Sequence, residues 1–302
     1  MSRLLWGIDL GGTKIEGTIL DADRPQSALY RLRRETGAAN GYDHVISQIA
    51  GVIRDLECAS GQKCPPVIGI GTPGALEPDT GTLKNSNTTC LNGRPLQEDI
   101  EAAVGSLVRT ANDANCFALA EATMGAAAGA EVVMGLILGT GVGGGIVVRG
   151  KILNGRHGIA GEWGHNPIAG ESHPCYCGRS GCVETVLAGP SLERDYREGG
   201  GVGIRLPEIV LRARAGETAA AAIIHRLQEK FGEAIAAVIN IIDPDAIVIG
   251  GGVGNVEELY NGETRECIRR HVFNRELRTR ILRPHLGDSA GVFGAALLGV
   301  EP

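Results

Sequence analysis

Two glycine-rich turns, each following an apolar segment, constrain the fold of this 302-residue chain more than any other feature. The first turn, residues 11–13, lies between the apolar runs 3–9 and 15–20. The second is the sequence GTGVGGG at 139–145, which has apolar runs on both sides. Apolar runs joined by glycine turns are typical of β-hairpins. Two similar hairpins well over 100 residues apart indicate an internal duplication, in which each half contributes one turn.

The glycine turns also suggest a ligand. Successive backbone N–H groups in such a turn form a concave surface that binds phosphate oxygens. Asp9, at the end of the first predicted strand, could bind Mg²⁺ directly or through water. A plain tight turn explains the first motif equally well. The chain lacks a P-loop, and neither turn has the glycine spacing of a dinucleotide-binding helix.

The rest of the chain alternates between helical and extended patterns. Hydrophobic spacing predicts helices at 42–56, 116–124, 206–215, 218–242 and 290–298, and strands at 67–71, 107–110, 132–138, 146–148 and 246–249. This order predicts an α/β fold with two lobes and a cleft between them. We expect a small N-terminal lobe of residues 1–111 plus the C-terminal helix 290–302, and a large lobe of residues 112–289.

Composition excludes several classes of protein. Apolar residues make up 43% and charged residues 21%, an ordinary globular balance that argues against disorder. The net charge of −6 and the absence of a basic block argue against a nucleic-acid partner. No apolar stretch reaches the length of a membrane span or of a signal sequence, so we expect a cytoplasmic protein without a membrane partner.

A cluster of metal-ligand types lies in residues 161–184. His165, Cys175, Cys177 and Cys182 form an H-x9-C-x-C-x4-C array, which matches a tetrahedral structural zinc site of three thiolates and one imidazole. Glycines at 178 and 181 let the chain turn tightly around such an ion. The alternative is three buried or oxidisable cysteines beside an unrelated histidine. Three of the eight cysteines lie within eight residues, which favours Zn²⁺.

Polar residues in two other places have alternative interpretations. Asp113 follows a predicted strand and precedes a helix, where a carboxylate can either cap the helix or accept a proton from a substrate hydroxyl. The segment 84–96 is rich in asparagine, and Asn85, Asn87 and Asn92 could read sugar hydroxyls. Asparagine is also a common turn residue, and without further context the turn interpretation is favoured.

Taken together, five motifs resemble the ROK family of sugar kinases, which belong to the actin-like ATPase superfamily. They are DLGGTK at 9–14, GTGVGGG at 139–145, GEWGH at 161–165, CYCGRSGCVE at 175–184 and GGG at 250–252. The similarity covers essentially the whole chain. It implies a two-lobed, ribonuclease H-like α/β fold with a duplicated sheet-and-helix core and a zinc-stabilised loop. It also implies transfer of the γ-phosphoryl group from MgATP to a hexose, and a homodimer.

The resemblance assigns roles to individual residues. Asp113 matches the catalytic base, and the zinc ligands are His165, Cys175, Cys177 and Cys182. The implied sugar contacts are Gly74, Asn87, Asn112, Glu162, His165 and Glu184, so that His165 serves both as zinc ligand and as pocket wall. The implied ATP and Mg²⁺ contacts are Asp9, Gly11, Gly12, Thr13, Lys14, Gly139, Thr140, Gly141, Gly143, Gly144 and Gly251.

The identity of the sugar follows only from finer similarity. The segments 84–96 and 160–167 look most like those of bacterial fructokinases, some of which accept mannose. Fructose is therefore the predicted substrate, giving the sugar 6-phosphate. Relatives that act on glucose, N-acetylglucosamine or N-acetylmannosamine share the catalytic residues and form the alternative.

A non-enzymatic function is the less favoured interpretation. The family includes sugar-responsive repressors with a DNA-binding module before the kinase-like part, but here the first motif begins at Asp9 and the chain is acidic. A non-catalytic sugar sensor is disfavoured because Asp113 and both glycine turns are present.

Overall fold

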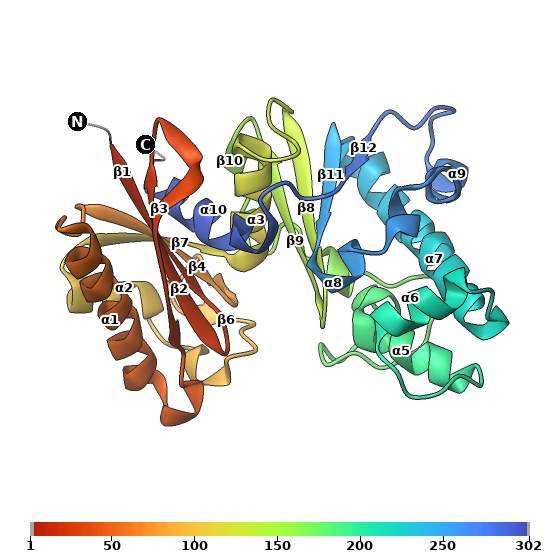
Figure 1. The fold of residues 1–302 in the computed structure, drawn as a ribbon, viewed down its shortest axis with the longest axis horizontal. Coiled ribbons are helices and arrows are strands. Elements are labelled where there is room, and N and C mark those ends of the chain that lie inside the picture. The colour runs from red at the N-terminus through yellow and green to blue at the C-terminus, as the bar shows by residue number, and fades with distance from the viewer. Residues whose placement is uncertain (1–2, 301–302) are drawn as a thin grey trace. The chain divides into compact units, whose positions relative to one another are not determined.

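The computed structural model describes residues 3–300, which form two compact units. Within the described residues, unit 1 comprises 3–129, 145–160 and 285–300, and unit 2 comprises 130–144 and 161–284. Each unit combines strands with covering helices (Figure 1). None of the helices formed by residues 3–300 combines the length and the apolar character needed to cross a membrane.

Unit 1 is built on a five-stranded sheet with the order β3-β2-β1-β4-β7. The strands are β1 (Leu4–Leu10), β2 (Lys14–Asp21), β3 (Arg24–Glu35), β4 (Val67–Thr72) and β7 (Leu107–Asn112). Strand β1 runs antiparallel to β2 and parallel to β4. Leu10 pairs directly with Ile15, so residues 11–14 make a tight connection, and the first predicted hairpin is confirmed.

Helices cover both faces of this sheet. They are α1 (Tyr42–Ser60), α2 (Leu96–Val104), α3 (Asp113–Thr123) and α10 (Ala290–Leu298). A Cβ atom added to Gly17 would meet Val52 of α1, whereas one added to Gly7 would meet Ala296 of α10. Gly17 pairs with Ile8, the neighbour of Gly7, and successive residues of a strand face opposite ways. Helices α1 and α10 therefore lie on opposite faces.

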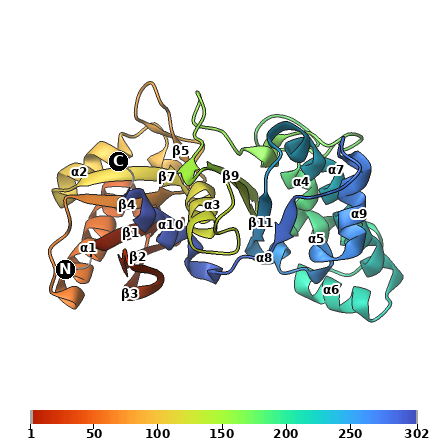
Figure 2. The same cartoon turned by 90° about the horizontal axis from the view of Figure 1, so that it is seen from above.

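Helix α10 lies unusually close to its neighbours, and Figure 2 shows it beside β1 and β4. An added Cβ atom at Gly69 of β4 would lie 1.8 Å from the carbonyl oxygen of Ala295. One at Gly294 would lie 1.8 Å from the carbonyl oxygen of Cys116 in α3. Because α3 packs against α10, residues 112–129 join unit 1. The predicted boundary between residues 111 and 112 therefore differs from the division seen in the structure, and residues 145–160 also belong to unit 1.

A second five-stranded sheet has the order β10-β9-β8-β11-β12. Its strands are β8 (Val132–Leu138), β9 (Val142–Val148), β10 (Lys151–Ile152), β11 (Ala246–Gly250) and β12 (Arg280–Leu282). Strand β11 runs parallel to both β8 and β12. The prediction of a hairpin around 139–145 is confirmed, but residues 142–145 belong to strand β9 and not to the turn.

Unit 2 contains the longest helix, α7 (Thr218–Ile242), which has the predicted bounds. Its buried residues recur every three or four positions, as in Leu227, Phe231 and Ile235, so that one stripe faces the core. The other helices of unit 2 are α4 (Glu184–Leu187), α5 (Gly189–Glu198), α6 (Leu206–Arg214), α8 (Gly251–Gly254) and α9 (Gly262–His271). Helices α5, α6 and α9 all pack against α7.

Short elements complete the chain. A two-stranded ribbon pairs β5 (Ala75–Leu76) with β6 (Leu83–Lys84). The 3-10 helices are η1 (Ala38–Asn40), η2 (Thr89–Leu91), η3 (Trp163–His165), η4 (Glu257–Tyr260) and η5 (Gly287–Ser289). The ribbon leads into the asparagine-rich segment 84–96, which contains η2, and η3 carries His165.

Candidate functional site

The first glycine turn in unit 1 is fixed by hydrogen bonds that leave its outer side open. Gly11 donates its N–H to the carbonyl oxygen of Lys14 over 2.9 Å, and the Thr36 hydroxyl donates to the carbonyl oxygen of Gly11 over 2.6 Å. Gly12, Thr13 and Lys14 are exposed. The structure therefore brings together four of the residues predicted to bind ATP, in a turn that phosphate oxygens can approach.

Asp9 lies at the end of β1 in a cradle made by glycines. Added Cβ atoms at Gly71 and Gly291 would lie 3.4 Å and 3.3 Å from its carboxylate oxygens. Burial, together with the charges of Asp113 and Glu16, raises the pKa of Asp9 to about 6. A crowded set of carboxylates is relieved by a cation, and carboxylate oxygen is a preferred ligand of Mg²⁺. These residues therefore fit the predicted magnesium ion.

Asp113 is the first residue of helix α3, and the preceding residue caps that helix. Asn112 is the N-cap residue, because its side-chain oxygen accepts from Ala114 N–H over 3.0 Å. Asp113 is the first helical residue, and its carboxylate accepts from the same N–H group over 2.7 Å. Desolvation by the surrounding protein raises the pKa of Asp113, while the hydrogen bonds from Ala114 and Asn112 lower it. The residue is nevertheless exposed, and an accessible carboxylate with a raised pKa is suited to general-base catalysis.

The asparagine-rich segment has mainly structural uses. The side chain of Asn92 makes two hydrogen bonds of 2.9 Å with the backbone of Ser86. Its amide oxygen accepts from the Ser86 N–H group, and its NH₂ group donates to the Ser86 carbonyl oxygen. Asn85 has a positive φ of 58°, which suits a turn. An added Cβ atom at Gly74 would lie 2.5 Å from the carbonyl oxygen of Lys84, so the backbone of Gly74 packs directly against the start of this segment. Asn87 is exposed and remains the candidate for a ligand contact.

In unit 2 the four predicted zinc ligands come together. The ligand atoms of His165, Cys175, Cys177 and Cys182 all lie within 4.8 Å of one another. The Cys177 and Cys182 sulfurs are 3.6 Å apart, as are the Cys175 sulfur and His165 Nδ1. Ligands at zinc–sulfur distance on a tetrahedron are about 3.7 Å apart, so this set fits Zn²⁺.

The backbone around the cluster explains how the thiols converge. Gly178 and Gly181 have φ values of 85° and 71°, which confirms that these glycines make the tight turns. The backbone N–H group of Arg179 and the neighbouring thiols of Cys175 and Cys182 lower the pKa of Cys177, whereas burial and the thiols of Cys177 and Cys175 raise the pKa of Cys182. Upstream, the Trp163 indole donates to the carbonyl oxygen of Ala234 on α7 over 3.1 Å and thereby anchors η3.

Residues 161–184, which carry the four predicted zinc ligands, are called the zinc segment below. Glu184 connects the end of this segment with the second glycine turn. It is the first residue of α4, and its carboxylate accepts from Val142 N–H over 2.9 Å. An added Cβ atom at Gly141 would lie 2.7 Å from the same carboxylate. The turn itself is held by Gly139, which donates to Gly141 and accepts from Gly189. Residues 139–141 and Glu184 therefore form one group.

Three of the predicted ATP contacts in unit 2, Gly143, Gly144 and Gly251, lie outside the second glycine turn. Two of them must be glycine because other backbone atoms pack closely against them. An added Cβ atom at Gly144 would lie 2.4 Å from the carbonyl oxygen of Gly161. Gly143 and Gly144 are both part of β9. Gly251 begins α8 with a φ of 81°, and a Cβ atom there would lie 2.3 Å from the carbonyl oxygen of Leu138. Close backbone packing is therefore sufficient to explain Gly144 and Gly251.

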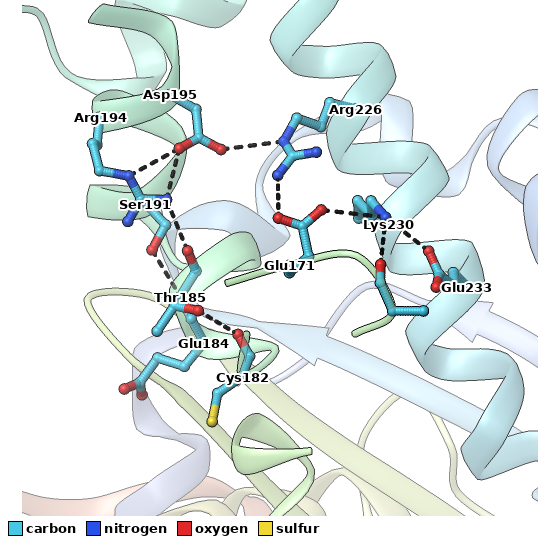
Figure 3. Close-up of polar contacts among 11 residues, drawn as sticks. Glu171, Cys182, Glu184, Thr185, Ser191, Arg194, Asp195, Arg226, Lys230 and Glu233 are labelled. Carbon is cyan, nitrogen blue, oxygen red and sulfur yellow. Dashed lines mark hydrogen bonds and ion pairs between the residues drawn. The ribbon is translucent and has the colours of Figure 1, made fainter. Parts of the chain in front are cut away.

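A network of ion pairs that sequence reasoning missed holds the zinc segment in place (Figure 3). Arg226 of α7 contacts Glu171 over 2.7 Å and Asp195 of α5 over 3.2 Å. Lys230, one turn later, contacts Glu171 over 3.2 Å. Arg194 bonds both Asp195 and the carbonyl oxygen of Thr185, the residue after Glu184.

The network reaches the metal ligands through the backbone of Glu171. An added Cβ atom at Gly181 would lie 2.3 Å from the Glu171 carbonyl oxygen, so the two segments touch next to Cys182. The side chains of Glu171 and Asp195 are each only 10% exposed. Because partly buried carboxylates need their partners, this arrangement fixes the zinc segment and α5 on α7.

Substitution of Arg226 tests this interpretation. We expect Arg226→Gln to lower the free energy of unfolding by about 1–2 kcal/mol, because Glu171 and Asp195 both lose a partner, although Lys230 and Arg194 remain. Chemical denaturation measures the change. Arg214→Gln, which breaks a more exposed bidentate pair with Glu258, is the matched control and should change stability less. Equal effects of the two substitutions would contradict a special role of Arg226.

A second group of potential metal ligands is formed by His173, Asp195 and Glu198. Asp195 already pairs with Arg194 and Arg226, whose positive charges oppose a bound cation. We therefore assign no metal to this group.

Comparison with known proteins agrees with the geometry. The model of the ROK family matches residues 5–301. The N-acetyl-D-glucosamine kinase of Vibrio cholerae is 33% identical over 308 aligned residues, which cover 99% of this chain and 100% of that protein. The crystal structure of a ROK hexokinase from Thermus thermophilus has a TM-score of 0.87 at 32% identity, covering 99% of this chain and 98% of that one. A ROK family glucokinase from Streptomyces griseus, solved with glucose and AMPPNP, has a TM-score of 0.80 at 29% identity, covering 99% and 100%.

Proposed function

This chain belongs to the ROK family and is an ATP-dependent sugar kinase, and we propose that its preferred acceptor is N-acetyl-D-glucosamine. Support for this sugar comes from full-length relatives such as the Vibrio cholerae and Photobacterium profundum kinases, which are 33% and 35% identical. Fructose, which we predicted from two short segments, has no support among these relatives. It is kept as the second candidate because the resemblance of 84–96 and 160–167 favours it.

One observation carries the catalytic part of the proposal, namely the carboxylate of Asp113 at the start of α3, which is accessible to solvent and has a raised pKa. In its ionised form Asp113 accepts the proton of the attacking sugar hydroxyl. The hydrogen bond from Ala114 N–H fixes the orientation of the carboxylate before the substrate arrives. Asn112 positions the same helix terminus as its N-cap and is proposed as a sugar contact, together with Gly74 and Asn87.

The phosphate groups of ATP are the proposed ligands of the glycine turns. The residues are Asp9, Gly11, Gly12, Thr13 and Lys14 in unit 1, and Gly139, Thr140, Gly141, Gly143, Gly144 and Gly251 in unit 2. When bound, Mg²⁺ neutralises charge that develops on the transferred phosphoryl group, and Asp9 is the residue that would hold it. Lys14 adds a positive charge next to the first turn.

Unit 2 contributes the proposed sugar contacts Glu162, His165 and Glu184. Zinc bound by His165 and the three cysteines would keep this segment in one conformation. Such positioning matters because phosphoryl transfer depends mostly on orientation and electrostatics. We also propose that the protein is a homodimer, which light scattering of the purified protein checks.

The test of the proposed function is ADP release with MgATP and each of N-acetylglucosamine, fructose, mannose and glucose. We expect kcat/KM to be highest for N-acetylglucosamine, with no release by a parallel Asp113→Asn preparation that controls for contaminating kinases. A preference for fructose would keep the kinase and overturn the proposed sugar. Absence of turnover with every sugar would overturn the kinase itself.

A further inference from the structure

Tyr176 is an aromatic residue that leaves most of its side chain open to solvent. It lies between the zinc ligands Cys175 and Cys177, and its side chain is 81% exposed. Large aromatic side chains usually bury most of their surface. A tyrosine held open to solvent inside a tight metal-binding turn therefore suggests contact with a ligand.

The orientation of Tyr176 is set by His165. The phenol oxygen lies 3.0 Å from His165 Nε2, and the two rings meet edge to face with centroids 5.1 Å apart. The other imidazole nitrogen, Nδ1, faces the Cys175 sulfur at 3.6 Å. The two ring nitrogens thus have separate partners, with Nδ1 toward the thiols and Nε2 toward the phenol.

The use of the two imidazole nitrogens determines whether the phenol O–H of Tyr176 remains available to donate. When Nδ1 is used on the thiol side, the proton of the neutral imidazole is on Nε2, which then donates to the Tyr176 oxygen. The phenol O–H is consequently free to donate to a third group. Because His165 is itself a proposed sugar contact, its partner Tyr176 lies next to the side chains proposed to hold the sugar in unit 2.

We propose that Tyr176 is a sugar-contacting, specificity-determining residue, whose phenol O–H donates to an oxygen of the substrate and whose exposed ring face covers apolar C–H groups of the sugar. The inference rests on the proposed sugar-kinase function. An aromatic ring with a polar tip suits a sugar, which presents both C–H faces and hydroxyl edges. The alternative is a purely structural role, in which Tyr176 only orients His165 as a metal ligand.

Two substitutions separate the contributions of the hydroxyl and the ring. We expect Tyr176→Phe to raise the KM for the sugar about fivefold, the effect of one lost hydrogen bond, while kcat and the KM for ATP change less than twofold. Tyr176→Leu also removes the aromatic face and should raise the sugar KM about 30-fold. Sugar affinity from calorimetry without ATP should change by the same factors. Tyr30→Phe, which removes a phenol on β3 in unit 1, is the control and should leave every value unchanged.

The outcomes also distinguish this inference from its premise. Wild-type turnover combined with an unchanged sugar KM in Tyr176→Phe would overturn the role of Tyr176 alone. A fall in zinc content and thermal stability in Tyr176→Phe, measured by metal analysis and calorimetry, would overturn it in favour of the structural role. A wild-type protein that neither binds nor phosphorylates any of the four sugars would overturn the proposed function and the inference with it.

Discussion

Asp113→Asn is expected to bind the sugar with nearly the affinity of the wild type, while kcat falls about 10³-fold. The amide of asparagine can still accept from Ala114 N–H, as the carboxylate does over 2.7 Å, so the start of α3 should keep its structure. It cannot accept the proton of the sugar hydroxyl. General-base catalysis typically contributes between 10²- and 10⁴-fold, which sets the expected loss.

The measurement compares steady-state turnover with sugar affinity from calorimetry. Asp43→Asn is the matched control, because Asp43 is likewise exposed in the first turn of a helix, α1, but is not among the proposed site residues. The raised pKa of Asp113 adds a second signature: kcat/KM of the wild type should fall as the pH drops through this pKa, because the protonated carboxyl is not a base. Asp113→Asn that keeps more than a tenth of wild-type kcat would exclude Asp113 as the base.

Cys177→Ala is expected to lose most of the bound zinc and to lower the melting temperature by about 10 °C. Removing one thiolate leaves three ligands, which are too few for a closed structural site. The free energy of zinc binding then no longer adds to the stability of the fold. Because the ligand atoms span residues 165–182, the segment that carries Glu184 should also become less ordered, and the sugar KM should rise.

Metal analysis and calorimetry on the same preparation test this prediction. Cys58→Ala, which removes an exposed cysteine outside the cluster, is the control and should change neither quantity. Treating the wild type with a strong chelator should reproduce the lowered melting temperature. An unchanged zinc content in Cys177→Ala would refute the metal assignment.

The zinc cluster and the glycine turns were predictable because each is encoded locally. Cys175, Cys177 and Cys182 lie within eight residues, so a short turn is enough to bring them together. Asp113 shows the limit of this reasoning. Its place at a strand–helix junction was correct, but only the structure shows that Asn112 is the cap and that the charge of Asp113 acts on Asp9.

Features that depend on distant residues were missed. Glu171 and Arg226 are 55 residues apart, and no pattern near either one indicates that they pair. Strand β3 escaped prediction because its mostly exposed sequence, RPQSALYRLRRE, lacks a regular alternation of apolar and polar residues. It forms a strand because it pairs with β2 along the edge of the sheet.

The comparisons corrected one further expectation. Fructose was predicted from the segments 84–96 and 160–167, and the asparagine side chains in the first of these proved partly structural. The relatives that match the full chain include N-acetylglucosamine kinases. A few residues of a binding loop are therefore a weak guide to the sugar, because loop residues must also build the loop.

The close packing of α10 against β1, β4 and α3 has a consequence for the order in which the protein is made. During synthesis, unit 2 has all of its residues once Pro284 has been added. Unit 1 is still incomplete at that point, because α10, which covers one face of its sheet, has not yet been made. Until then the early strands expose the apolar face and the glycines that α10 later covers. Contacts across such long sequence separations slow folding, and exposed sheet faces attract other chains. Unit 1 is therefore the unit that completes its packing last.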